Sequence, residues 1–239
     1  MELDGHRNAG LIDCPGALVA GVSALHSTLC HLALGLDQGD LSGAWLPASV
    51  QHLSALRALR VDVGDMIGHE NSQIDSMLQH LPGLTGLLLD GDFYEAPSPA
   101  IAAMSQLQWL HLGRSFNADD DSLPTGPYQT SLRHLVVDFA TAVDSVPVLS
   151  GMPRLARLSL LEPPCPQQGW EAFWDWAAQH PPLRLLEYMD VGDGADHPGH
   201  VSTETLSSLV QLVRRRPALQ VRGLPDAIEG YIPELLSGW

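Results

Sequence analysis

The chain has 239 residues, enough for one large domain or two small ones, and its hydrophobic content of 45% is ordinary for a globular protein. It carries 28 acidic residues against 12 positively charged ones, all arginine, for a formal net charge of −16. Phosphate backbones and anionic lipid surfaces repel such a chain, so the composition argues against nucleic-acid and membrane partners and favours a basic protein partner.

Several absences indicate where the protein works. The first ten residues, MELDGHRNAG, lack the basic and then apolar pattern of a signal peptide, and no apolar run approaches the roughly 20 residues that span a bilayer. The cysteines Cys14, Cys30 and Cys165 show neither a disulfide framework nor zinc-site spacing, and no Asn-x-Ser/Thr site occurs. We therefore expect a reducing compartment, the cytoplasm.

The N-terminal residues 1–24 contain the apolar stretch LIDCPGALVAGVSAL. We expect a partial repeat or an N-terminal cap there. No polar pattern of the kind that closes a repeat array is visible, which leaves open that the chain is part of a longer array or complex.

From residue 29 onward, a short LxxLxL-like pattern recurs seven times. It begins with LCHLAL at 29, LRALRV at 56, LTGLLL at 84, LQWLHL at 107, LRHLVV at 132, LARLSL at 155 and LRLLEY at 183. The first leucines lie 27, 28, 23, 25, 23 and 28 residues apart, a period typical of stacked repeats. The three apolar positions alternate as on a short strand, and the segments between hits are apolar at helical spacing. One such unit cannot bury its apolar face alone, so neighbours are expected to share a core.

The stretch LALGLDQGDLSGAWLPASVQHLSALRALRV (32–61) is similar to a plant-type leucine-rich repeat, LxLxxNxLsGxIPxxhxxLxxLxxL. Leu41-Ser42-Gly43 and Leu46-Pro47 match, followed by the apolar positions at 50, 53, 56 and 59. Residues 25–224 thus resemble a leucine-rich repeat protein of irregular plant or algal type, in the ribonuclease-inhibitor-like superfamily. The resemblance implies an α/β solenoid: a horseshoe of about seven or eight irregular coils, with a parallel concave β-sheet and convex helices or turns.

The family's asparagine ladder is missing, so we expect uneven loops. Its positions hold Asp37, Gly64, Asp92, Ser115, Ala140, Pro163 and Val191.

We expect the solenoid to occupy residues 25–200, and residues 201–239 to form a C-terminal helix and a degenerate last coil or cap. STETLSSLVQLVRRR (202–216) predicts the helix, with Ser202 or Thr203 as N-cap and three arginines at its C-terminal end. LQVRGL (219–224) matches the repeat poorly.

The residues between the repeated leucines are the candidate partner-binding surface. If Leu107, Leu110 and Leu112 point inward, strand alternation sends Trp109 and His111 onto the concave face. Tryptophan and arginine carry much of the binding energy at protein interfaces, so we expect a site there. Its candidate residues are His31, Arg60, Leu88, Trp109, His111, His134, Val136 and Arg157. The alternative is that Trp109 only shields the sheet while the histidines are solvated.

Fourteen aspartates follow a strand hit, and we expect them on loops along one edge. One interpretation is that aspartate suits turns and that its charge keeps the protein soluble. The other is that these residues form an acidic rim that attracts a basic partner. They are Asp37, Asp40, Asp62, Asp65, Asp90, Asp92, Asp119, Asp120, Asp121, Asp138, Asp144, Asp190, Asp193 and Asp196.

Two conspicuous stretches have simple structural interpretations. DVGDGADHPGH (190–200) lacks the order of a calcium loop, so we expect a solvated insertion and no metal. GWEAFWDWAAQH (169–180) predicts a core helix with Trp170, Phe173, Trp174 and Ala177 on one face. Trp176 lies off that face, and we expect it to be exposed.

The sequence contains no GxSxG motif, no phosphate-binding loop and no HExxH motif, so we expect neither catalysis nor a cofactor. The function we expect is a non-catalytic protein–protein interaction module that binds a protein on its concave face. The resemblance leaves three alternatives: the substrate-recognition part of an F-box-type ubiquitin ligase adaptor, a fragment of a plant-type receptor ectodomain, and a scaffold of the cytoskeleton or axoneme. LSGAWLP favours the receptor, whereas the missing signal peptide and paired cysteines oppose it.

Overall fold

A computed structural model describes residues 2–3, 27–36, 50–63, 72–93, 99–113, 115–116, 122–161, 169–189 and 203–223. The insertion predicted at 190–200, the LSGAWLP motif and most of the N-terminal segment lie outside these residues. So do the aspartates at 37, 40, 65, 119–121, 190, 193 and 196.

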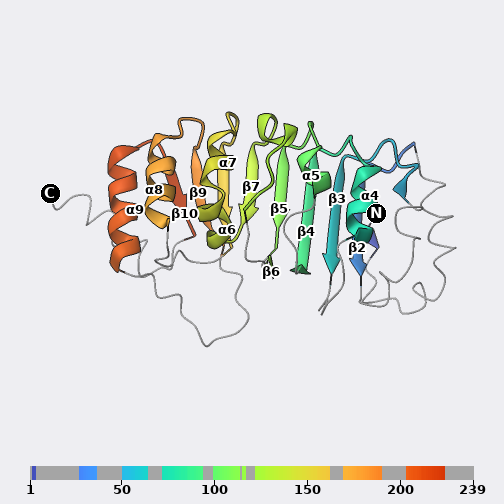
Figure 1. The fold of residues 1–239 in the computed structure, drawn as a ribbon, viewed down its shortest axis with the longest axis horizontal. Coiled ribbons are helices and arrows are strands. Elements are labelled where there is room, and N and C mark those ends of the chain that lie inside the picture. Colours follow the sequence, from blue (N-terminus) through green and yellow to red (C-terminus); the bar gives the residue numbers. More distant parts are fainter. Residues whose placement is uncertain are drawn as a thin grey trace.

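The strands form one open parallel sheet in which neighbours follow chain order (Figure 1). The order is β1-β2-β3-β4-β5-β7-β8-β9-β10, and β6 lies off this path, paired with β4. The strands are β1 (Glu2–Leu3), β2 (His31–Leu36), β3 (Ala58–Val63), β4 (Gly86–Phe93), β5 (Trp109–Leu112), β6 (Ser115–Phe116), β7 (His134–Val137), β8 (Arg157–Leu160), β9 (Leu185–Tyr188) and β10 (Gln220–Arg222).

Each of the seven repeat hits supplies one strand, which begins two residues after the first leucine of the hit. The predicted parallel sheet is thus confirmed. The poorly matching 219–224 stretch also contributes a strand, because β10 pairs in parallel with β9.

From β3 to β10, helices lie between neighbouring strands of the sheet, as the apolar spacing predicts. They are α4 (Ser72–Gln79), α5 (Pro99–Ala102), the 3-10 helix η3 (Pro127–Thr130), α6 (Phe139–Asp144), α7 (Val146–Ser150), α8 (Trp170–Gln179) and α9 (Thr203–Arg215). One continuous core joins the inward residues of the strands to the apolar faces of these helices. Leu107, Leu110 and Leu112 belong to it and are fully buried.

The prediction that Trp176 is exposed was wrong. Its side chain is 7% exposed, and its ring stacks on that of His180 with centroids 5.0 Å apart. Helix α8 has α9 on one side and packs against α6 and α7 as well, so more than one stripe of its surface is covered. A single helical face therefore underestimates what α8 buries.

Arg216 ties α9 to α8. Its guanidinium donates hydrogen bonds to the backbone carbonyls of Ala177, His180, Pro181 and Leu183, at the end of α8 and in the turn that follows. The sequence predicts that the arginines at 214–216 serve the end of their own helix, whereas the side chain of Arg216 bonds carbonyls of the neighbouring helix and of the turn after it.

Candidate functional site

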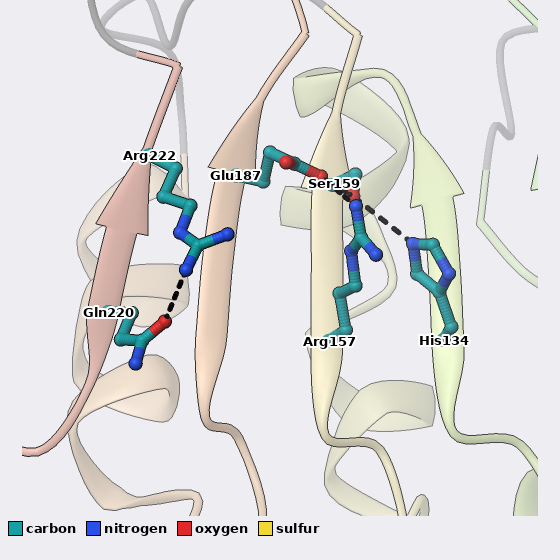
Figure 2. Close-up of polar contacts among 6 residues, drawn as sticks. All are labelled: His134, Arg157, Ser159, Glu187, Gln220 and Arg222. Carbon is teal, nitrogen blue, oxygen red and sulfur yellow. Dashed lines mark hydrogen bonds and ion pairs between the residues drawn. The ribbon is translucent and has the colours of Figure 1, made fainter.

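The side chains that alternate with the buried leucines form a second surface of the sheet, the open face. Figure 2 draws six of these side chains, which lie in front of the strands with the helices behind. Strand register aligns them in rows. Row one is His31, Ala58, Gly86, Trp109, His134, Arg157, Leu185 and Gln220; row two is Ala33, Arg60, Leu88, His111, Val136, Ser159, Glu187 and Arg222.

All eight candidate residues fall in these two adjacent rows. Trp109, His111 and His134 are brought into contact, whereas His31 and Arg60 lie on strands nearer the N-terminus. Arg60 is exposed and forms an ion pair of 3.5 Å with Asp62 on its own strand.

The centre of the open face is a ring cluster of Trp109, His111 and His134. The half-buried Trp109 ring meets the His111 ring edge-on and the His134 ring at a tilt of 50°, each with centroids 6.2 Å apart. On the β4 side, a Cβ at Gly86 would lie 3.4 Å from Cε3 of Trp109. The indole therefore rests against a strand position that has no side chain.

Beside the ring cluster lies a polar network of His134, Arg157, Ser159 and Glu187, drawn from β7, β8 and β9 (Figure 2). Nε2 of His134 lies 3.2 Å from Oγ of Ser159, and that hydroxyl donates to Oε2 of Glu187 over 3.0 Å. Nη2 of Arg157 donates to the same carboxylate oxygen. Because His134 belongs to both groups, the aromatic and polar parts of the site are continuous.

The site holds one ionised acid and two neutral imidazoles at neutral pH. The hydrogen bond from Arg157 is the main reason that the pKa of Glu187 lies below its ordinary value. Burial, followed by the charge of Arg157, lowers the pKa of His134 to about 4. Burial also lowers the pKa of His111, although the carboxylate of Asp90 opposes the shift.

These protonation states fix the direction of the hydrogen bonds. Ionised Glu187 can only accept, so the single hydroxyl proton of Ser159 points to it. The contact between His134 and Ser159 then requires Nε2 of His134 to donate to Oγ, which leaves Nδ1 as the acceptor nitrogen of the neutral ring.

Val136 differs from the other candidates because it is only 2% exposed. It lies between His111 and Ser159 in row two, on the same strand as His134. Val136 is absent from the core beneath the helices, so it is covered from the open-face side. Its role is to support the cluster, not to present accessible surface.

Ser159 and Glu187 were not among the candidates, although strand alternation places both on the open face. Ser159 is fully buried, and Glu187 is half-buried. Small and acidic residues on a strand carry no signal of their own in the sequence. Only the register of β7, β8 and β9 shows that they connect His134 to Arg157.

Asp90 and Asp138 accept hydrogen bonds from residues close to them in sequence. Asp138 is the N-cap of α6 and accepts hydrogen bonds from the backbone nitrogen and hydroxyl of Thr141, each over 2.7 Å. Oδ1 of Asp90 accepts from the backbone nitrogen of Gly91 over 3.1 Å. Asp62 lies in β3, Asp90 and Asp92 lie in β4, and Asp144 lies in α6, so the prediction that these four lie on loops was wrong. Capping chemistry thus accounts for Asp138.

Within the described ranges, no group of three or more His, Cys, Asp or Glu residues is placed to hold a metal ion. The helices of the same ranges include none with the length and apolar character needed to cross a membrane.

Comparison with known proteins adds no assignment to this geometry. No protein-family model matches the chain, and no curated protein matches it.

Proposed function

We propose that this chain is a leucine-rich repeat protein whose open face is the concave face of the solenoid and binds a protein partner without catalysing a reaction. The observation that carries the proposal is the ring cluster of Trp109, His111 and His134, continuous with the polar network around Arg157. The seven-fold leucine period and the chain-order parallel sheet support the family.

The composition of this surface suits a protein interface. A half-buried tryptophan and an arginine lie in one row, and such residues dominate binding hot spots. Ring contacts and hydrogen bonds already hold Trp109, His134 and Arg157 in place. A partner therefore loses little side-chain entropy at these positions when it binds.

The hydrogen-bond order supports binding over catalysis. The nucleophilic serine of a Ser-His-acid triad has a histidine base next to it and an acid on the far side of that histidine. Here the serine stands in the middle and gives its proton to Glu187, while Nε2 of His134 donates to it. Ser159 is also fully buried, so a substrate cannot reach its oxygen.

The cytoplasm is the compartment that we propose. Cys30 is a free, exposed cysteine, and an exposed thiol persists most readily where the surroundings are reducing.

Affinity capture from a lysate of the source cells, read by mass spectrometry, tests the proposal with three forms of the chain. These are the unchanged protein, Trp109→Ala, and a control His80→Ala, which alters an exposed residue after α4. Circular dichroism first establishes that all three fold alike. We expect at least one partner that the unchanged chain and His80→Ala retain and Trp109→Ala loses, followed by direct binding of the two purified proteins. Identical partner sets for all three forms would contradict the proposal.

A further inference from the structure

The atom that His134 offers to a ligand follows from its neighbours. Its Nε2 donates to Ser159, because the hydroxyl proton of Ser159 goes to Glu187. The remaining ring nitrogen, Nδ1, carries a lone pair and no proton. A ligand group that hydrogen-bonds to it must therefore be a donor.

The adjacent side chain is the half-buried Trp109. Its indole lies in row one next to His134 and rests against Gly86 on the other side. The face of an indole carries negative potential and attracts cations. His111, which meets the same indole edge-on, is uncharged at neutral pH and does not repel a cation.

The charges beside His111 favour a cation as well. On the His134 side, the bond from Arg157 to Glu187 partly offsets the positive charge of Arg157, which lowers the pKa of His134. Arg60 is paired with Asp62, and Asp90 adds a negative charge beside His111. The whole chain carries −16, which draws cationic groups towards it.

We propose that Trp109 and His134 form a subsite for an arginine side chain of the protein partner. The inference rests on the proposed function and specifies its chemistry. A planar guanidinium stacks on the indole face and, from its edge, donates an N–H to Nδ1 of His134. A lysine ammonium has the charge, but it has no flat face to stack while it donates. A neutral donor lacks the attraction to the ring.

Three matched peptides test the subsite on the full chain: Ac-Gly-Arg-Gly-NH2, its citrulline analogue and its lysine analogue. Citrulline keeps the shape and most donors of arginine but has no charge. Binding is followed by NMR through the indole N–H resonance of Trp109, which the variant Trp109→Phe identifies by its disappearance. Each peptide is titrated into the unchanged chain, Trp109→Leu, Trp109→Phe and the control His80→Leu. Circular dichroism first checks that all four proteins fold alike. Binding to each is measured through the backbone amide resonances of β5 and β7, which every variant retains.

We expect saturable binding of the arginine peptide, weaker binding of the lysine peptide and the weakest binding of citrulline. Trp109→Leu is expected to lower the affinity for the arginine peptide about fivefold or more, which corresponds to the loss of one cation–π contact. Trp109→Phe keeps an aromatic face, so its affinity for the arginine peptide falls less. His80→Leu binds the arginine peptide as tightly as the unchanged chain.

Equal affinity of Trp109→Leu and the unchanged chain would show general attraction to an acidic protein and overturn the subsite. Equal affinity for citrulline, or no saturable binding of arginine, would overturn it too, and equal affinity for lysine would overturn the choice of arginine. These results are distinguishable from failure of the proposed function. A captured partner that Trp109→Ala loses would still support binding at the open face, even if the arginine peptide does not bind.

Discussion

The guanidinium of Arg216 donates a hydrogen bond to the backbone oxygen of His180, the C-cap residue of α8, although the two residues lie 36 positions apart in the chain. Arg216 also bonds three further carbonyls around that helix end. One side chain thus terminates a helix to which it does not belong and fixes α9 beside it.

Replacing Arg216 is expected to weaken the C-terminal part of the fold. Arg216→Ala leaves several carbonyls at the end of α8 without their charged donor, which we expect to lower the free energy of unfolding by about 2 kcal/mol. Urea denaturation followed by circular dichroism measures it. Arg215→Ala is the control, because its ion pair with Asp175 is exposed on both sides and is expected to contribute about 0.5 kcal/mol. Equal losses for the two variants would contradict the capping role.

Stability is expected to fall as the solution becomes acidic. The pKa of His134 is about 4 in the folded chain, below the ordinary value of 6.5, so the unfolded chain binds more protons between these values. The contribution is present in full above about pH 6.5 and is lost as the pH falls towards 4. Arg157, Glu187 and His111 are the charged and titratable groups that act on this ring.

Denaturation curves measured from pH 7 to pH 4.5 test this dependence. His134→Gln cannot titrate, so we expect its stability to decline less steeply over this range than that of the unchanged chain. The exposed His52→Gln is the control and should follow the unchanged chain. Parallel curves for all three would show that His134 does not contribute to the acid sensitivity.

Gly113 is expected to tolerate no side chain. A Cβ there would lie 2.4 Å from Oδ1 of Asp90 and 2.9 Å from its Cα, so both the carboxylate and the backbone of β4 would have to move. We expect Gly113→Ala to destabilise the chain by about 1–3 kcal/mol in urea denaturation. The comparison is Gly83→Ala, whose Cβ meets only the flexible end of Arg57 at 3.3 Å. A Gly113→Ala variant as stable as Gly83→Ala would be inconsistent with this packing.

Substitutions at Asp138 test whether this aspartate matters as a helix cap or as a negative charge. Asp138→Ala removes the N-cap of α6 and is expected to destabilise the fold by about 1 kcal/mol, whereas Asp138→Asn keeps an acceptor oxygen and should lose less. Urea denaturation of both variants makes the comparison. If both lose equally, the charge and not the cap is what matters at this position.

The leucine period predicts the sheet because each strand depends on a local pattern repeated in register. The positions of Trp109 and His134 followed from that alternation alone. Burial of Trp176 and the reach of Arg216 did not follow, since both depend on how α8 and α9 lie side by side. The link from Ser159 to Glu187 depends on the register of strands 28 residues apart. Contacts between neighbouring coils therefore lie beyond a residue-by-residue prediction.

The chain-order sheet also has a kinetic consequence. Among the described strands, paired residues are never far apart in sequence: the widest pairing, Leu185 with Gln220, spans 220 − 185 = 35 positions. Each of these strands pairs with a segment close to it in sequence, so folding is able to start at any pair of neighbouring coils and spread outward. Fraying is expected to begin at the two edges, and the ring cluster on β5 and β7 lies in the interior strands, which open last.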